Sequence, residues 1–203
     1  MKNLLKRLVT STGTKPCINV VSGLPRSGTS MMMKMLEAGG CTILADHVRS
    51  ADIDNPKGYY EFERAKQLEN GDTGWLVDAE HKTVKIISAL LKYLPLDYKY
   101  KIIFMTRNLD EVIASQRKML VNREEDSNTV TEDKLQEMLE IHLLQTRQWL
   151  SQQPNILVHY VSYNTLLTDE ATQISEITNF IGGELEPAQM LKIIEPTLHR
   201  NKS

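Results

Sequence analysis

A glycine-containing segment near the N-terminus has the residue types and spacing of an anion-binding loop. It stands between an apolar, β-branched run and a stretch of helical periodicity, and it contains two glycines five residues apart. Glycine permits the tight backbone conformations that bring amide groups close to a ligand. The amides at the start of the following helix lack partners within the helix, and the helix dipole also favours an anion there. We therefore expect a phosphate or a similar anion to contact Gly23, Pro25, Arg26, Ser27, Gly28, Thr29 and Ser30.

The loop differs at one position from the phosphate loop of ATP- and GTP-binding proteins. In that loop a lysine before the final serine or threonine reaches the β- and γ-phosphates. Thr29 occupies the lysine position here, and the nearest cation is Arg26. The alternative to anion binding is a tight turn that only begins a helix. The preceding strand, the following helix and the arginine within the loop together favour anion binding.

A second arginine follows the most apolar strand of the sequence. Arg107 comes directly after Lys101–Thr106, and Ser115 follows eight residues later. A guanidinium binds phosphate through two parallel hydrogen bonds, and a serine two helical turns further on can reach the same anion. The alternative is that Arg107 only pairs with Asp110 or Glu111, with Ser115 serving as a small residue in close packing.

The elements that must position these residues alternate in type along the chain. The expected strands are Ile18–Val21, Thr42–Leu44, Thr83–Ile87, Lys101–Thr106 and Ile156–Val161. The expected helices are Ser30–Ala38, Glu61–Glu69, Ser88–Tyr93, one capped by Asn108 and Glu111, one over 135–150, Ala171–Ile181 and Pro187–Ile194. Strands separated by helices predict an α/β fold, with a central parallel sheet of about five strands in a three-layer αβα arrangement. Ligands of such sheets bind at the carboxyl ends of the strands, where both arginines lie.

The composition excludes several kinds of protein. With 203 residues, 41% of them hydrophobic and 25% charged, the chain is predicted to be one globular domain over 1–203, with 1–14 as a loosely ordered leader. A formal net charge of −2 argues against a nucleic-acid partner, and no apolar run has the length of a membrane span. The two cysteines, Cys17 and Cys41, form neither a zinc motif nor a disulfide framework. We therefore predict no metal and a cytoplasmic location.

The loop and the second arginine segment together resemble the signatures of the sulfotransferase superfamily. The run from Pro25 to Ser30 (PRSGTS) is similar to the family loop that binds a 5′-phosphosulfate, which also lacks the ATPase lysine and is found in bacterial-type members. The run from Ile102 to Ser115 is similar to the segment that holds a 3′-phosphate. The resemblance implies a P-loop-containing fold that moves a sulfuryl group from 3′-phosphoadenosine 5′-phosphosulfate (PAPS) to a hydroxyl or amine acceptor. The product would be adenosine 3′,5′-bisphosphate (PAP).

The resemblance also implies roles for individual residues in the transfer. Arg26 would contact the sulfuryl group and the leaving phosphate, and a base must take the proton of the acceptor. The family uses histidine or glutamate as this base, and Asp46, His47 and Glu61 all stay open for it. Lys85 is similar to a family lysine that faces the transferred group. The alternative is a strand lysine that only extends its ammonium to solvent.

Two further residues are implied in binding the nucleotide. Tyr163 is similar to a family tyrosine that lies against the adenine, although a half-buried aromatic residue is the alternative. Arg200 would close over the nucleotide near a phosphate. A P-loop nucleotide kinase or NTPase, and a non-catalytic nucleotide-binding member of the fold, remain as alternative functions. The acceptor could be a small molecule, a glycan, a lipid or a protein side chain, and the sequence leaves both its identity and the oligomeric state open.

Overall fold

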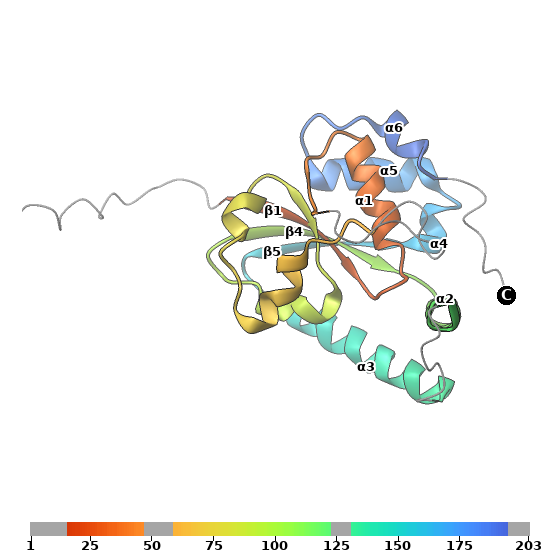
Figure 1. Ribbon diagram of the computed structural model, residues 1–203. Helices are drawn as coiled ribbons and strands as arrows, with labels where there is room; N and C mark the ends of the chain where they lie inside the picture. The colour runs from red at the N-terminus through yellow and green to blue at the C-terminus, as the bar shows by residue number, and fades with distance from the viewer. Residues whose placement is uncertain (1–15, 47–58, 123–130, 195–203) are drawn as a thin grey trace, which may run out of the picture.

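A parallel sheet runs through the centre of the chain, with helices on both of its faces (Figure 1). The computed structural model describes residues 16–46, 59–122 and 131–194. The strands are β1 (Cys17–Gly23), β2 (Ile43–Leu44), β3 (Thr83–Lys85), β4 (Lys99–Thr106) and β5 (Ile156–Ser162). Their order is β2-β3-β1-β4-β5, and every neighbouring pair is parallel. The predicted α/β fold with a five-stranded parallel sheet is confirmed.

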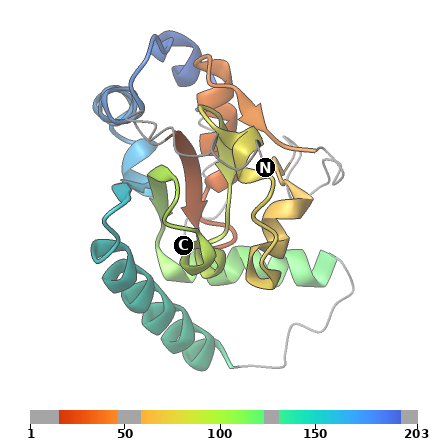
Figure 2. The same cartoon turned by 90° about the vertical axis from the view of Figure 1, so that its left-hand side faces the viewer.

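The helices divide between the two faces and one end of the sheet. One face carries α1 (Thr29–Ala38), α4 (Tyr163–Leu166), α5 (Glu170–Ile181) and α6 (Pro187–Leu191). The opposite face carries α3 (Glu132–Ser151) and the 3-10 helices η1 (Glu63–Asn70), η2 (Leu76–Ala79) and η3 (Ser88–Tyr93). The helix α2 (Leu109–Asn122) lies at the carboxyl end of the central strands (Figure 1 and Figure 2). Together the two faces and the sheet make the three expected layers.

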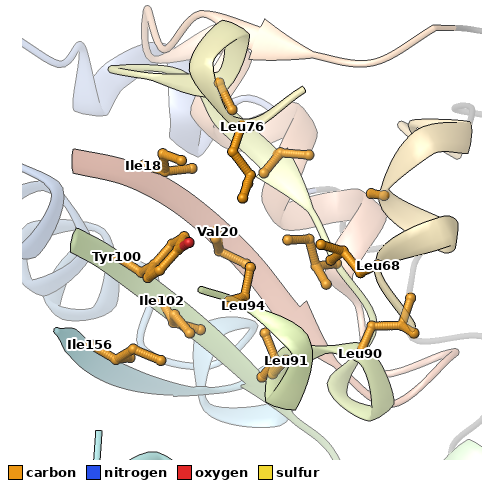
Figure 3. Packing of buried hydrophobic residues seen from close by; sticks show 14 of the residues in the cluster. Ile18, Val20, Leu68, Leu76, Leu90, Leu91, Leu94, Tyr100, Ile102 and Ile156 are labelled. Atoms are coloured by element: carbon orange, nitrogen blue, oxygen red, sulfur yellow. The ribbon is translucent and has the colours of Figure 1, made fainter. Parts of the chain in front are cut away.

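The two central strands are buried on both faces, which explains their nearly continuous apolar sequence. Successive side chains of a strand point to opposite faces. Val20 and Ile102 therefore join one hydrophobic cluster, while Val21 and Ile103 join the other. Figure 3 shows the first cluster, in which leucines of η1, η2 and η3 pack on the face of β1 and β4 that carries Ile18, Val20 and Ile102. This packing fixes the positions of β1 and β4, whose ends carry the two arginine segments.

The helix predicted over Glu61–Glu69 differs from expectation in its start and its type. It is the 3-10 helix η1, and it begins at Glu63, whose amide donates a 2.6 Å hydrogen bond to the carboxylate of Asp46. It ends at Asn70 and is capped by Gly71, which has φ 83°, as the Asn-Gly pair indicates. The short helices η2 and α4 were not predicted, because four residues are too few to show a helical period.

No helix within the described ranges is long and apolar enough to cross a membrane. The leader 1–14, His47 and Arg200 lie outside the described residues.

Candidate active site

The glycine loop joins β1 to α1 through three residues with positive φ angles. Gly23 has φ 147°, Arg26 φ 72° and Gly28 φ 97°. The turn is closed by Ser27, whose amide and hydroxyl both donate to the carbonyl of Leu24, at 3.2 and 2.8 Å. A side chain at Gly28 would meet the ring of Tyr163 at 2.5 Å. Glycine is therefore required here both by the backbone conformation and by the space available.

The first turn of α1 can act as an anion site. Its cap residue is Gly28, which has no side chain to cover the first amides, and the first turn contains no acidic residue. Thr29 and Ser30 follow directly, and both line a pocket at this edge of the sheet. A helix N-terminus of this kind offers several N–H donors together with the positive end of the helix dipole.

Arg107 lies beside this loop, although the two segments are 81 residues apart in the sequence. It follows β4, the strand that pairs with β1, and its Nη1 donates to the carbonyl of Arg26 at 3.2 Å. Its guanidinium stacks over the ring of Tyr163, 4.3 Å from the ring centre. Ser115 completes the group, since its hydroxyl accepts a 2.9 Å hydrogen bond from Nε of Arg26. Two cations from separate segments thus meet at the carboxyl edge of the sheet.

Arg107 also forms the ion pair that the sequence left open as an alternative. Its Nε donates to the carboxylate of Glu111 at 2.7 Å, one turn along α2. The same carboxylate accepts a 2.8 Å hydrogen bond from the side-chain amide of Asn164, so Glu111 links α2 to α4.

The capping box expected at the start of α2 is only half formed. The Asn108 side chain accepts from the amide of Asp110 at 2.8 Å, but Glu111 turns to Arg107 instead of back to the cap. Sequence reasoning gave no role to Asn164, although it follows Tyr163 directly.

Tyr163 closes one end of the site. It is the first residue of α4, and its ring contacts both the Arg107 guanidinium and the space beside Gly28. Burial raises the pKa of its hydroxyl, an effect that the Arg107 charge opposes and the Glu111 charge reinforces. Tyr163 therefore keeps its proton at neutral pH and presents an uncharged aromatic surface to the pocket.

Lys85 lies on the other side of the loop. It ends β3, which pairs with β1 on the side away from β4. Its ammonium donates to the hydroxyl of Ser30 at 3.3 Å and to the carbonyl of Tyr59 at 3.0 Å. The first turn of α1 therefore has a cation on each side, with Lys85 on one side and the two arginines on the other.

The structure separates the two described carboxylates that are candidates for the base. Glu61 lines the pocket and forms a 2.7 Å ion pair with Lys66. Asp46 lies outside the pocket lining, with its carboxylate on the amide that begins η1.

Most of the described site residues line one pocket of about 450 Å³, whereas Gly23, Ser27, Asp46 and Ser115 lie outside its lining. Its wall comes from the loop, α1, η1, the end of β3, η3, α2 and α4. Among the residues in 16–46, 59–122 and 131–194, no three His, Cys, Asp or Glu side chains lie together as a metal site would require. Among the described residues, the pocket lining combines the cations Arg26, Lys66, Lys85 and Arg107 with the carboxylate of Glu61.

A family model described as a sulfotransferase domain matches residues 19–203. The chain belongs to this sulfotransferase family. The match covers nearly all of the sequence, including both arginine segments. No curated protein matched this sulfotransferase in the sequence comparison.

Solved structures with a similar fold are sulfotransferases as well. The sulfotransferase domain of the Synechococcus PCC 7002 olefin synthase has 16% identity and a TM-score of 0.52, over 95% of this chain and 86% of that one. The sulfotransferase domain from the curacin biosynthetic pathway has 15% identity and a TM-score of 0.51, over 90% and 79%. A mouse sulfotransferase complexed with PAP has 19% identity and a TM-score of 0.53, over 90% of this chain but 63% of the mouse chain. At such low sequence identities, the similarity is evidence for the fold alone.

Proposed function

We propose that this sulfotransferase transfers a sulfuryl group from PAPS to a hydroxyl or amine acceptor and releases PAP. The observation that carries the proposal is the contact between the two anion sites, with Arg107 Nη1 3.2 Å from the carbonyl of Arg26 in the loop. A nucleotide with phosphate at both its 5′ and 3′ positions requires two such sites side by side. The mouse sulfotransferase of similar fold binds PAP, which agrees with this proposal.

The residues fit the two ends of such a nucleotide. In the proposal, Pro25, Gly28 and the amides and hydroxyls of Thr29 and Ser30 hold the 5′ end, where helix-start donors suit an anion. Gly23 and Ser27 would act by shaping the turn, since both donors of Ser27 are bonded to Leu24. Arg107 and Ser115 hold the 3′-phosphate, and the Glu111 ion pair orients the guanidinium. Tyr163 lies against the adenine, and Arg200 stays a prediction.

The catalytic residues are proposed from their places around the loop. Arg26 and Lys85 flank the start of α1 and would offset the negative charge that develops on the leaving phosphate and the transferred group. Of the two described carboxylates, Glu61 is the better base, because it faces the pocket while Asp46 holds the start of η1.

Thermal denaturation with a panel of nucleotides tests the proposal. A ligand at 100 times its dissociation constant stabilises the folded state by about 2.7 kcal/mol. For a chain of this length, that corresponds to a rise in melting temperature of roughly 5–10 °C. We expect this rise with PAPS and PAP, and little with ATP or GTP, because Thr29 occupies the position of the ATPase lysine. Stabilisation by ATP or GTP alone would point to a kinase or NTPase and overturn the proposal.

A further inference from the structure

The pocket has an apolar side that the proposed nucleotide contacts leave unused. It lies beyond Lys85, on the β3 side of the loop and away from Arg107. Its wall comes from the residue before η1, from η1 itself, from the segment after β3 and from η3. The residues are Phe62, Ala65, Ile86, Ile87 and Leu90.

This wall is part of the packed core and is already formed. Ala65, Ile86 and Leu90 are buried members of the hydrophobic cluster on that face of the sheet. Phe62 packs edge-on against the buried Trp75, with ring centres 5.2 Å apart. Side chains held by core packing keep their positions when a ligand arrives, so the shape of this side is set before binding.

Few polar side chains line this side among the described residues. They are Tyr59, Glu61, Lys66 and Lys85, and Glu61 forms an ion pair with Lys66. None of the five apolar side chains offers a hydrogen-bond donor or acceptor. A ligand here can place one polar group near Glu61 and Lys85, while the rest of it must rest against hydrocarbon and aromatic surface.

We infer that the acceptor is an alcohol or phenol whose single hydroxyl is carried on an apolar body, rather than a sugar or a peptide side chain. The inference rests on the proposed function. The oxygen–sulfur bond to the acceptor forms as the bond from sulfur to the 5′-phosphate oxygen breaks, and the hydroxyl proton passes to the Glu61 carboxylate. The further hydroxyls of a sugar would lose their water at the apolar wall without gaining partners.

A homologous series of alcohols tests the inference by equilibrium binding. We would measure dissociation constants of 1-butanol, 1-hexanol, 1-octanol and 2-naphthol for the PAP-loaded protein by calorimetry. N-acetylglucosamine and a tyrosine-containing peptide would serve as the polar comparison. Each methylene that becomes buried should tighten binding roughly fourfold, and the sugar and peptide should bind more weakly than octanol. A series with no chain-length dependence, or a sugar that binds more tightly than octanol, would overturn the inference.

A matched pair of variants locates the effect in the pocket. Ile87 lines the apolar wall and is 40% exposed, whereas Val77 on η2 is 57% exposed and does not line the pocket. Ile87→Ser should weaken octanol binding about tenfold, since it removes most of one apolar side chain from the wall. It should leave PAP affinity unchanged, and Val77→Ser should alter neither. Equal octanol affinity in the two variants would contradict the inference.

The outcomes separate this inference from the proposed function. PAP affinity is measured separately, and a protein that does not bind PAP would contradict the transferase proposal. The alcohol series is therefore repeated without nucleotide. Alcohol binding that tightens with chain length and is weakened by Ile87→Ser would still support the apolar site. Alcohol binding without these two features would overturn it.

Discussion

At the scale of single residues, the glycine loop between β1 and α1 depends on a contact between a glycine and an aromatic ring. Gly28 has φ 97°, and the Tyr163 ring occupies the space that a side chain would need. Gly71 offers a matched comparison, because it has φ 83° and lies outside the pocket lining. Among the described residues, no atom lies within 4 Å of the place that a methyl group on Gly71 would take. The two glycines share the backbone requirement and differ in steric surroundings.

Gly28→Ala should therefore be more harmful than Gly71→Ala. The positive φ alone should lower the free energy of unfolding by about 1–2 kcal/mol in each variant. Gly28→Ala should in addition displace Tyr163 and weaken PAP binding by at least about tenfold, measured by calorimetry. Equal PAP affinity in the two variants would show that the Gly28–Tyr163 contact does not shape the nucleotide site.

Arg107 is expected to distinguish PAP from adenosine 5′-monophosphate. Loss of charge-assisted hydrogen bonds to a phosphate weakens binding by roughly 30- to 100-fold. Arg107→Ala should show this loss for PAP and a much smaller one for the monophosphate, which has no 3′-phosphate. The control is Arg64→Ala, since Arg64 pairs with Asp72 and lies outside the pocket lining. Equal losses for both nucleotides would mean that Arg107 does not read the 3′-phosphate.

Lys85 is expected to act on turnover more than on nucleotide binding. Its ammonium lies at Ser30, where charge would develop during transfer. Lys85→Met should lower kcat about 100-fold and leave PAP affinity within about twofold, because the interaction strengthens in the transition state. Arg26→Ala should likewise lower kcat more than it lowers PAP affinity. Lys82→Met is the control, as Lys82 precedes the same strand and lies outside the pocket lining. A parallel loss of kcat and PAP affinity would assign Lys85 to ground-state binding.

At the scale of elements, a histidine joins two helices on the face of the sheet that η3 covers. His142 of α3 lies 2.8 Å from the hydroxyl of Ser88, the first residue of η3. Burial, with a smaller effect from the Lys92 charge, lowers its pKa below the ordinary value of 6.5.

This lowered pKa predicts an acid-sensitive stability. The unfolded chain binds a proton at His142 more readily than the folded chain does, so the free energy of unfolding falls as the pH drops below about 6.5. His142→Gln removes the titrating imidazole. In urea titrations, its free energy of unfolding should therefore fall less steeply than that of the native protein between about pH 7 and pH 5. At neutral pH it should cost about 1 kcal/mol through the lost hydrogen bond. His81→Gln, at an exposed position, serves as the control. An unchanged slope in His142→Gln would exclude the effect.

At the scale of the whole molecule, the strand order brings the residues proposed to bind the nucleotide together. The central strands β1 and β4 pair along seven positions and end beside one another, while β3 supplies Lys85 on the opposite flank. One ligand can therefore bridge elements that are far apart along the chain.

Hydrogen exchange measures this bridging directly. If both segments bind the same ligand as proposed, PAP should slow amide exchange in 23–30 and 107–115 together. The edge strand β2 should be unaffected, which makes it an internal control. Protection of the loop without protection of 107–115 would indicate a ligand held at one phosphate only.

The sheet, the glycine loop and the position of Arg107 could all be predicted from the sequence. Glycine spacing, apolar strand runs and the cap at Asn108 are local features, and local features are visible in order along the chain. The same motifs indicate the sulfotransferase family, which the family match confirms. A cytoplasmic location and the roles of single site residues stay predictions.

The meeting of particular residues depends on the tertiary structure. The contacts of Arg107 with Arg26, of Tyr163 with Gly28 and of Lys85 with Ser30 join segments that lie on different strands and helices. The sequence could not separate Asp46 from Glu61 either, since only the fold places Glu61 in the pocket lining and Asp46 on the amide that begins η1. Side chains of similar chemistry look alike in a sequence. The strand order and the packing of the helices determine which of them face a common pocket.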